Sequence, residues 1–177
     1  MKDIDAKAKA IKIVIFDVDG VLTNGSLIIG DDGQEYKAFN SRDGHGIKML
    51  IKSGVEVAII TGRTSEVVKH RIRDLGIKTV YQGQHDKTIA FKDLLSSKNL
   101  TADECAYVGD DVVDLPVMSQ VGLAIAVQDA HPMVKQHAHW QTPNKGGCGA
   151  GRDVCEMIME AQGHLQTELQ SYLHQDE

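Results

Sequence analysis

Short apolar runs alternate with helix-like segments along most of this 177-residue chain, and this alternation limits the folds that it can adopt. Five of the runs are predicted strands, because continuous apolar stretches of this length are typical of strands buried on both faces. They span residues 11–16, 55–60, 79–81, 105–108 and 123–127. Strands that alternate with helices favour right-handed crossovers. The predicted fold class is therefore α/β, with an open, doubly wound, mostly parallel Rossmann-like sheet.

Helices are predicted between these strands from the spacing of their apolar residues. One pattern runs through Ile47, Leu50 and Ile51 and a second through Val68, Ile72 and Leu75, with Gly54 and Gly76 as their stops. A third helix is predicted at 88–98, and Thr101 to Glu104 has the spacing of a capping box. An apolar stripe over 154–169 predicts one C-terminal helix.

The segment 26–39 interrupts the alternation. Its two short apolar runs flank Gly30-Asp31-Asp32-Gly33, and Asp-Gly between such runs predicts a β-hairpin. We expect a single domain over 1–177, with this hairpin as an insertion and with a glycine-rich tail and C-terminal helix at 146–177. The intervals on either side of Thr61 are too short for a further folded unit, so no cap domain is expected.

Charge and cysteine content restrict the partners and the compartment. The chain has 19 Lys and Arg against 25 Asp and Glu, a net charge of −6, so it offers no basic field to nucleic acid or to an anionic membrane. Three unpatterned cysteines favour a reducing compartment. No apolar run approaches the ~18 residues that span a bilayer, and no apolar leader follows Met1. A cytoplasmic location is expected.

Polar side chains collect where the predicted strands end. The carboxyl ends of parallel strands meet at one edge of the sheet, and open α/β sheets bind their ligands there. The residues that follow these ends, with the lysine that opens the third helix, are Asp17, Asp19, Thr61, Lys87, Asp110, Asp111 and Asp114. Five carboxylates so close repel one another, and burying them unpaired costs several kcal/mol. A hard divalent cation, Mg²⁺, would relieve this repulsion and is the predicted cofactor.

The same cluster contains groups that bind phosphate. The Thr61 hydroxyl and the Gly62 N–H can donate hydrogen bonds to phosphate oxygens, and Lys87 carries positive charge. A carboxylate, a metal, a hydroxyl and a lysine around one point are what phosphoryl transfer requires. A single Asp-x-Asp at a strand end would fit an ordinary polar turn equally well. The residues alone do not separate a nucleophile from a proton donor.

Four motifs in order carry a resemblance to a known family. They are DVDGV at 17–21, TGR at 61–63, Lys87 and GDDVVD at 109–114. This order resembles that of the haloacid dehalogenase (HAD) phosphohydrolase superfamily. Beyond these motifs, AFNSRDGHGI, VAIITGR, YQGQHDK and AYVGDD are similar to segments of the 3-deoxy-D-manno-octulosonate (KDO) 8-phosphate phosphatases, a family that serves lipopolysaccharide synthesis in Gram-negative bacteria.

The resemblance implies a role for each residue of the cluster. Asp17 would attack phosphorus and form an aspartyl-phosphate, and Asp19 would protonate the leaving sugar oxygen and later activate water. Mg²⁺ would be held by Asp17, by the backbone carbonyl of Asp19 and by Asp110. Thr61 and Lys87 would hold the phosphoryl group. Asp111 and Asp114 would orient waters and Lys87.

Substrate contacts and assembly are also implied by the resemblance. The expected substrate is a small sugar-acid phosphate, bound by Asp19, Asn40, Ser41, Arg42, Asp43, Gly44, Gly62, Arg63, Arg71 and Lys87. Residues 40–43 would equally fit a solvated helix cap, and Arg71 an exposed basic face. In this family the hairpins of four subunits associate, so a homo-oligomer, as a tetramer, is expected. The glycine-rich tail could then reach a neighbouring site.

Three other functions fit parts of the pattern. The first is phosphatase activity on a different small sugar phosphate. The second is a phospho-acceptor domain of the receiver type, which also uses Asp, Thr and Lys, but which needs its acceptor after the third strand and its Thr and Lys later still. The third is a silent HAD-fold subunit, against which the intact Asp17 and Asp19 argue.

Overall fold

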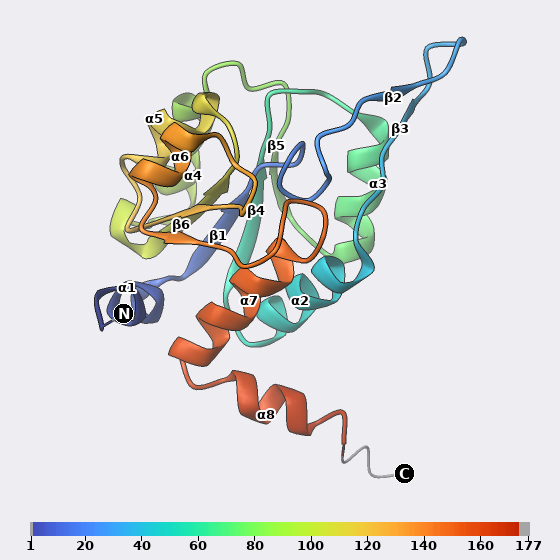
Figure 1. The fold of residues 1–177 in the computed structure, drawn as a ribbon. Coiled ribbons are helices and arrows are strands. Elements are labelled where there is room, and N and C mark those ends of the chain that lie inside the picture. Colours follow the sequence, from blue (N-terminus) through green and yellow to red (C-terminus); the bar gives the residue numbers. More distant parts are fainter. Residues whose placement is uncertain (1, 174–177) are drawn as a thin grey trace.

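A six-stranded parallel sheet forms the centre of the computed structural model, which describes residues 2–173 (Figure 1). The strand order is β5-β4-β1-β6-β7-β8. The strands are β1 (Ile13–Phe16), β4 (Glu56–Ile60), β5 (Thr79–Tyr81), β6 (Cys105–Gly109), β7 (Leu123–Ala126) and β8 (Trp140–Gln141). The chain adds β4 and β5 on one side of β1 and then β6, β7 and β8 on the other side, so the direction of winding reverses after β5. This arrangement confirms the predicted doubly wound α/β sheet.

Helices cover both faces of the sheet. One group contains α2 (Ser41–Lys52), α3 (Glu66–Leu75) and α7 (Ala150–Ala161), with α2 packed along α7, and α1 (Lys2–Ala10) beside α7. The other group contains α4 (Lys87–Lys98), α5 (Leu115–Met118) and α6 (Pro132–His137), which contact one another in series. Right-handed crossovers place the two groups on opposite faces because the winding reverses after β5. No helix among residues 2–173 is long and apolar enough to cross a membrane.

Most predicted elements are present, and the differences have local causes. All five predicted strands form, and α3 ends at Gly76 in the left-handed conformation, with φ 75°. The predicted C-terminal helix is instead two, α7 and α8 (Leu165–Gln170), because Gly163 with φ 78° interrupts it. The short elements α1, α6 and β8 were not predicted. Strand β8 has only two residues, and it is defined by its pairing with β7 and not by an apolar run.

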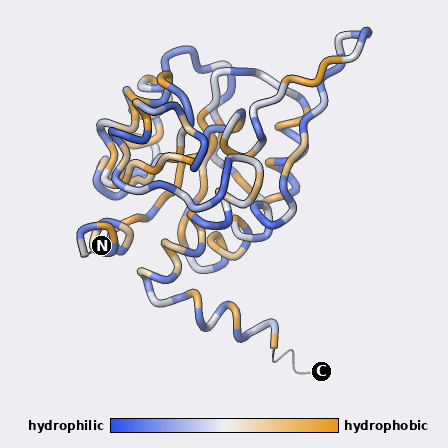
Figure 2. Tube along the Cα trace, in the orientation of Figure 1, coloured by the Kyte–Doolittle hydropathy of each residue, from blue (hydrophilic) through white to orange (hydrophobic). Residues whose placement is uncertain are grey.

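The predicted hairpin projects from the body of the molecule (Figure 1). Its strands β2 (Ile28–Ile29) and β3 (Glu35–Tyr36) pair only with each other. The apolar β2 segment stands out on the projecting arm in Figure 2. Four of its apolar side chains are half-exposed or more, namely Leu27, Ile28, Ile29 and Tyr36. Phe39, which the sequence placed on the same apolar face, instead packs against the core below the guanidinium of Arg71.

The glycine-rich segment packs against its own chain. The N–H of Gly147 donates to the carbonyl of Val21 at 2.9 Å, and the N–H of Gly146 donates to Asp129. A Cβ on Gly146 would lie 1.8 Å from the carbonyl oxygen of Gly20, and one on Gly147 would lie 2.4 Å from the Thr23 backbone. Residues 146–147 therefore pack against the loop that follows β1 of the same chain. The expectation that the glycine-rich tail reaches a neighbouring site stays a prediction.

We expect Gly146→Ala to reduce activity more than stability. The added methyl group displaces Gly20, and with it the neighbouring Asp19, while small-to-large changes in packed sites cost typically about 1–3 kcal/mol. Misplacement of a catalytic group by 1 Å can cost about 10²-fold in rate. Steady-state kinetics and thermal unfolding test this expectation. Gly163→Ala is the control, since its Cβ meets nothing within 4 Å and only its positive φ is strained. Equal kcat values for the two variants would contradict the expectation.

Candidate active site

The register of the central strands brings the predicted residues to one edge. Phe16, the last residue of β1, is in register with Ile59 of β4 and Val108 of β6. The three strands thus end side by side. A cavity of about 390 Å³ opens there. Its lining includes the predicted residues Asp17, Asp19, Thr61, Gly62, Arg63, Lys87, Asp110 and Asp111.

Lys87 is a buried cation that lies between two carboxylates of the site. Its Nζ lies 2.7 Å from Oδ2 of Asp17 and 2.7 Å from Oδ1 of Asp114, and its side chain is 3% exposed. Burial opposes the charged form, but the two carboxylates outweigh it and raise the pKa of Lys87 above its usual value. The N-cap of α4 is Asp86, whose side chain accepts from the N–H of Thr88, so the first helical residue is Lys87. The helix start therefore delivers this ammonium to the sheet edge.

Asp114 is fully occupied by protein donors. Its Oδ1 accepts from Lys87 and from the hydroxyl of Tyr107 at 2.7 Å, and its Oδ2 accepts from the N–H groups of Asp110 and Asp111. The residue is completely buried. Asp114 thus holds Lys87 and the loop after β6 in place. Asp111 instead caps the turn at 112–114 by accepting from the Val112 N–H, so Asp114 is the member of this pair that contacts Lys87.

Tyr107 is a part of the site that sequence reasoning missed. It is completely buried in the middle of β6, where an aromatic residue is expected as ordinary core. Its hydroxyl donates to Asp114 and accepts from Nζ of Lys87 at 3.2 Å. A tyrosine in place of a wholly apolar residue in this central strand was the available signal, because buried hydroxyls need a partner.

We expect Tyr107→Phe to destabilise the protein and to slow catalysis. Loss of a buried hydrogen bond to a charged group costs about 1.5–3 kcal/mol, and Lys87 and Asp114 lose a shared partner. Denaturant unfolding and kcat are the measurements. Tyr81→Phe is the matched control, because the hydroxyl of Tyr81 donates to the exposed carboxylate of Asp93. Unfolding free energies that fall equally in the two variants would refute the role given to Tyr107.

Asp17 and Asp110 are crowded carboxylates. One ligand atom from each of Asp17, Asp110 and Asp114 lies within 4.8 Å of the others. Burial, and then Asp114, raises the pKa of Asp17 to about 6 against the opposing effect of Lys87. Burial, Asp114 and Asp17 raise the pKa of Asp110 to about 7. One lysine thus leaves the cluster short of positive charge.

These residues fit a hard divalent cation. Carboxylate oxygens are the ligands that Mg²⁺ prefers, and the side chain of Asp110 receives no hydrogen bond from residues 2–173. A Cβ on Gly20 would lie 2.1 Å from Oδ2 of Asp110, so any residue other than glycine at position 20 would displace this carboxylate. Because Asp114 is saturated, Asp17 and Asp110 are the side chains that can hold the ion.

The other predicted substrate contacts lie away from this cavity. Asn40 caps α2 by accepting from the Arg42 N–H, and Ser41 and Arg42 are exposed. Asp43 is 2% exposed and accepts from the N–H of Arg152 in α7 at 2.9 Å. Residues 40, 43, 44 and 71 border a separate small hollow. Within one chain these residues hold α2, α3 and α7 together, and their contact with substrate remains a prediction.

Further residues at the cavity were not predicted. Leu27, Gln84, His85 and Val113 line it. On the side of Asp19, Glu35 accepts from Arg63 and pairs with Lys37. The Ser65 hydroxyl, Arg63 and Lys37 lower the pKa of Glu35 to about 2 against the effect of burial. Gln84 and His85 lie three and two residues before Lys87, and this closeness to the predicted phosphate-binding lysine was the signal for them.

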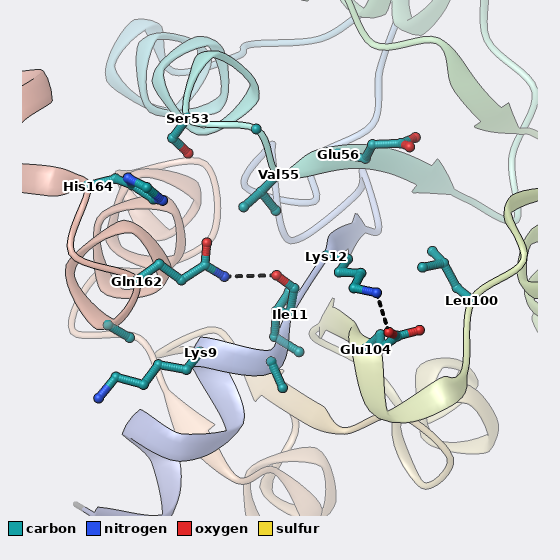
Figure 3. Close-up of a pocket in the computed structure, with 13 residues that line it drawn as sticks. Lys9, Ile11, Lys12, Ser53, Val55, Glu56, Leu100, Glu104, Gln162 and His164 are labelled. Carbon is teal, nitrogen blue, oxygen red and sulfur yellow. Dashed lines mark hydrogen bonds and ion pairs between the residues drawn. The ribbon is translucent and has the colours of Figure 1, made fainter.

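A larger cavity, of about 880 Å³, lies at the opposite, amino edge of the sheet (Figure 3). Lys12 and Glu104 pair across it at 2.5 Å, and Gln162 donates to the carbonyl of Ile11. Lys9, Ser53 and Glu56, which also line it, pair with Asp5, the Leu50 carbonyl and Lys98 respectively. The cluster of carboxylates with a buried lysine lies instead at the carboxyl edge.

Comparison with known proteins shows the family of this chain. A family model described as haloacid dehalogenase-like hydrolase matches residues 79–149. The chain is 50% identical over 163 residues to the 3-deoxy-D-manno-octulosonate 8-phosphate phosphatase of Escherichia coli, an alignment that covers 92% of this chain and 87% of that protein.

Solved structures are similar over nearly the whole chain. A probable YrbI-family phosphatase from Pseudomonas syringae has a TM-score of 0.98 and 47% identity, covering 99% of this chain and 100% of that one. The KDO 8-phosphate phosphatase from Moraxella catarrhalis, solved with a magnesium ion, a phosphate ion and KDO, has a TM-score of 0.95 and 39% identity, covering 97% and 99%. The present chain therefore belongs to the KDO 8-phosphate phosphatase family of haloacid dehalogenase-like hydrolases.

Proposed function

We propose that this protein is a Mg²⁺-dependent phosphatase that hydrolyses KDO 8-phosphate to KDO and phosphate, in lipopolysaccharide biosynthesis. The observation that carries the proposal is the pairing of Lys87 with Asp17 and Asp114 beside the carboxylate of Asp110, which accepts no hydrogen bond from residues 2–173. The names and the bound groups of the relatives identify the substrate. The reaction takes place in the cytoplasm, where the three unpaired cysteines stay reduced.

The proposed reaction has two steps. A carboxylate oxygen of Asp17 attacks phosphorus as the bond from phosphorus to the sugar oxygen breaks, and Asp19 gives that oxygen a proton. Asp19 then takes a proton from water, which attacks phosphorus and releases Asp17. Asp17, Asp110 and the Asp19 carbonyl would hold Mg²⁺, which supplies positive charge beside the phosphoryl oxygens. Lys87 and the Thr61 hydroxyl bind the other phosphoryl oxygens.

A substrate panel tests the proposed function. Phosphate release is measured with Mg²⁺ across sugar phosphates that include KDO 8-phosphate, and we expect the highest kcat/KM for KDO 8-phosphate. A clearly higher kcat/KM for another sugar phosphate would refute KDO 8-phosphate as the substrate and identify that compound instead. Release of at most one phosphate per chain from every compound would instead identify a phospho-acceptor domain of the receiver type.

The proposal includes a homo-oligomer, formed as a tetramer through the hairpins. A two-stranded hairpin is marginally stable alone in water, and this one exposes Leu27, Ile28, Ile29 and Tyr36. Leu27 also lines the cavity, so association through this arm would place the site near a subunit boundary. Sedimentation at micromolar concentration tests the assembly. A monomer with full activity would contradict it, and Ile29→Lys should weaken association in a protein that does assemble.

A further inference from the structure

The stem of the hairpin carries a buried lysine that meets the back of the active site. Lys37 follows β3, and its side chain is only 1% exposed. Its Nζ lies 2.5 Å from Oδ1 of Asp19 and 3.2 Å from Oε1 of Glu35. Lysines are almost never buried to this extent unless they are paired. The pairing with Asp19 therefore accounts for the position of Lys37.

Glu35 connects this lysine to a second cation. Its Oε1 also accepts from Nη2 of Arg63 at 2.8 Å, while Nε of Arg63 lies 3.8 Å from Oδ2 of Asp19. The side chains of Asp19, Lys37, Glu35 and Arg63 thus form a ring in which carboxylates and cations alternate. They join the loop after β1, the hairpin and the loop after β4.

The two oxygens of Asp19 have different surroundings. Lys37 donates a hydrogen bond to Oδ1, whereas Oδ2 lies 3.8 Å from Nε of Arg63, beyond hydrogen-bond distance. Asp19 and Arg63 line the cavity, and Lys37 does not. Lys37 therefore holds Oδ1 of Asp19 from outside the lining of the cavity.

We propose that Lys37, supported by Glu35, is a positioning residue that fixes the Asp19 carboxylate for proton transfer to the leaving oxygen, an inference that rests on the phosphatase function proposed above. Oδ2 of Asp19 gives its proton to the departing alkoxide oxygen as the phosphorus–oxygen bond breaks and Asp17 bonds to phosphorus. The hairpin stem thereby completes the proton-transfer machinery of its own subunit.

This role predicts a dependence on the leaving group. A sugar alkoxide is a poor leaving group and needs the proton, whereas p-nitrophenolate is acidic enough to leave without it. The ratio kcat/KM reports the steps up to the first irreversible one, so the later hydrolysis of the intermediate does not enter it. A general structural defect would lower kcat/KM for both kinds of substrate.

The experiment compares Lys37→Met with the wild type on KDO 8-phosphate, on a simple alkyl phosphate and on p-nitrophenyl phosphate. General acid catalysis is worth about 10²–10⁴-fold, and we expect a loss of about tenfold or more for both alkyl substrates and of less than about threefold for p-nitrophenyl phosphate. Lys37→Arg should restore part of the alkyl rate. Lys98→Met, which removes an ion pair with Glu56 outside the site, is the control and should match the wild type.

Equal losses on aryl and alkyl phosphates, or no loss, would overturn the proposal. If Lys37→Met does not fold, Glu35→Gln provides an independent test, because it weakens the support of Lys37 without a change at Asp19. It should lower kcat/KM for the alkyl substrates more than for p-nitrophenyl phosphate, by a smaller factor than Lys37→Met. A wild type that hydrolyses the simple alkyl phosphate but not KDO 8-phosphate would refute the proposed substrate, and the comparison for Lys37 would still be decided by the other two compounds.

Discussion

Replacement of Asp17 by asparagine should abolish turnover while the protein stays folded. An amide does not attack phosphorus, so no aspartyl-phosphate forms. The fold should survive because Lys87 keeps its partner Asp114, 2.7 Å away, and because the change removes a buried carboxylate from a crowded cluster. The measurements are steady-state phosphate release and the thermal unfolding midpoint.

Asp5→Asn is a suitable control for this variant, because Asp5 forms only an exposed pair with Lys9 on α1. It should keep the wild-type rate. Retained steady-state hydrolysis by Asp17→Asn would rule out Asp17 as the nucleophile.

Removal of Mg²⁺ should abolish phosphate release as completely as Asp17→Asn does. EDTA should bring phosphate release to background and Mg²⁺ should restore it, because Asp17, Asp110 and Asp114 leave the site short of positive charge. Ca²⁺ should not restore it, since its looser and higher coordination can occupy both oxygens of Asp17. Activity that persists after exhaustive chelation, or full activity with Ca²⁺, would contradict this expectation.

Stability gives a second measure of the metal. A ligand that binds only the folded state at 100 times its Kd stabilises that state by about 2.7 kcal/mol, so Mg²⁺ should raise Tm for the wild type and much less for Asp110→Asn. The raised pKa of Asp110 sets the sign without metal. Ionisation of Asp110 costs stability that accumulates as pH rises from the ordinary value of 3.8 to the folded pKa of about 7, so in EDTA at pH 8 Asp110→Asn should be more stable than the wild type. A lower Tm for Asp110→Asn than for the wild type under these conditions would refute a destabilising effect of the ionised Asp110 carboxylate in this cluster.

The chemistry at the sheet edge was predictable because it depends on strand ends. Asp17, Thr61 and Asp110 directly follow β1, β4 and β6, so a correct strand assignment is enough to bring them together. Lys37 was not predictable in this way, since a lysine in a projecting hairpin is ordinarily solvated. Only the packing of the hairpin stem against the loop after β1 buries it.

The burial of Asp43 was not predictable either. Its position at the start of α2 fits a solvated helix cap, but α7 packs along α2 and its first turn covers the carboxylate, while contact of Asp43 with substrate stays a prediction. This contact joins residues 109 positions apart, and no local pattern contains it. Tyr107 is similar, because its hydroxyl in an apolar strand indicates that a partner is needed but does not identify Lys87 and Asp114 as the partners.

The burst kinetics of Asp19→Asn with p-nitrophenyl phosphate test the two-step reaction most directly. This substrate needs no proton to form the intermediate, whereas hydrolysis of the intermediate needs the Asp19 base. We predict a rapid burst of p-nitrophenolate stoichiometric with the protein, slow release of phosphate, and a phosphoryl group bound to the peptide that contains Asp17. Release of p-nitrophenolate and phosphate in step, with no phosphoryl group on that peptide, would contradict the covalent mechanism.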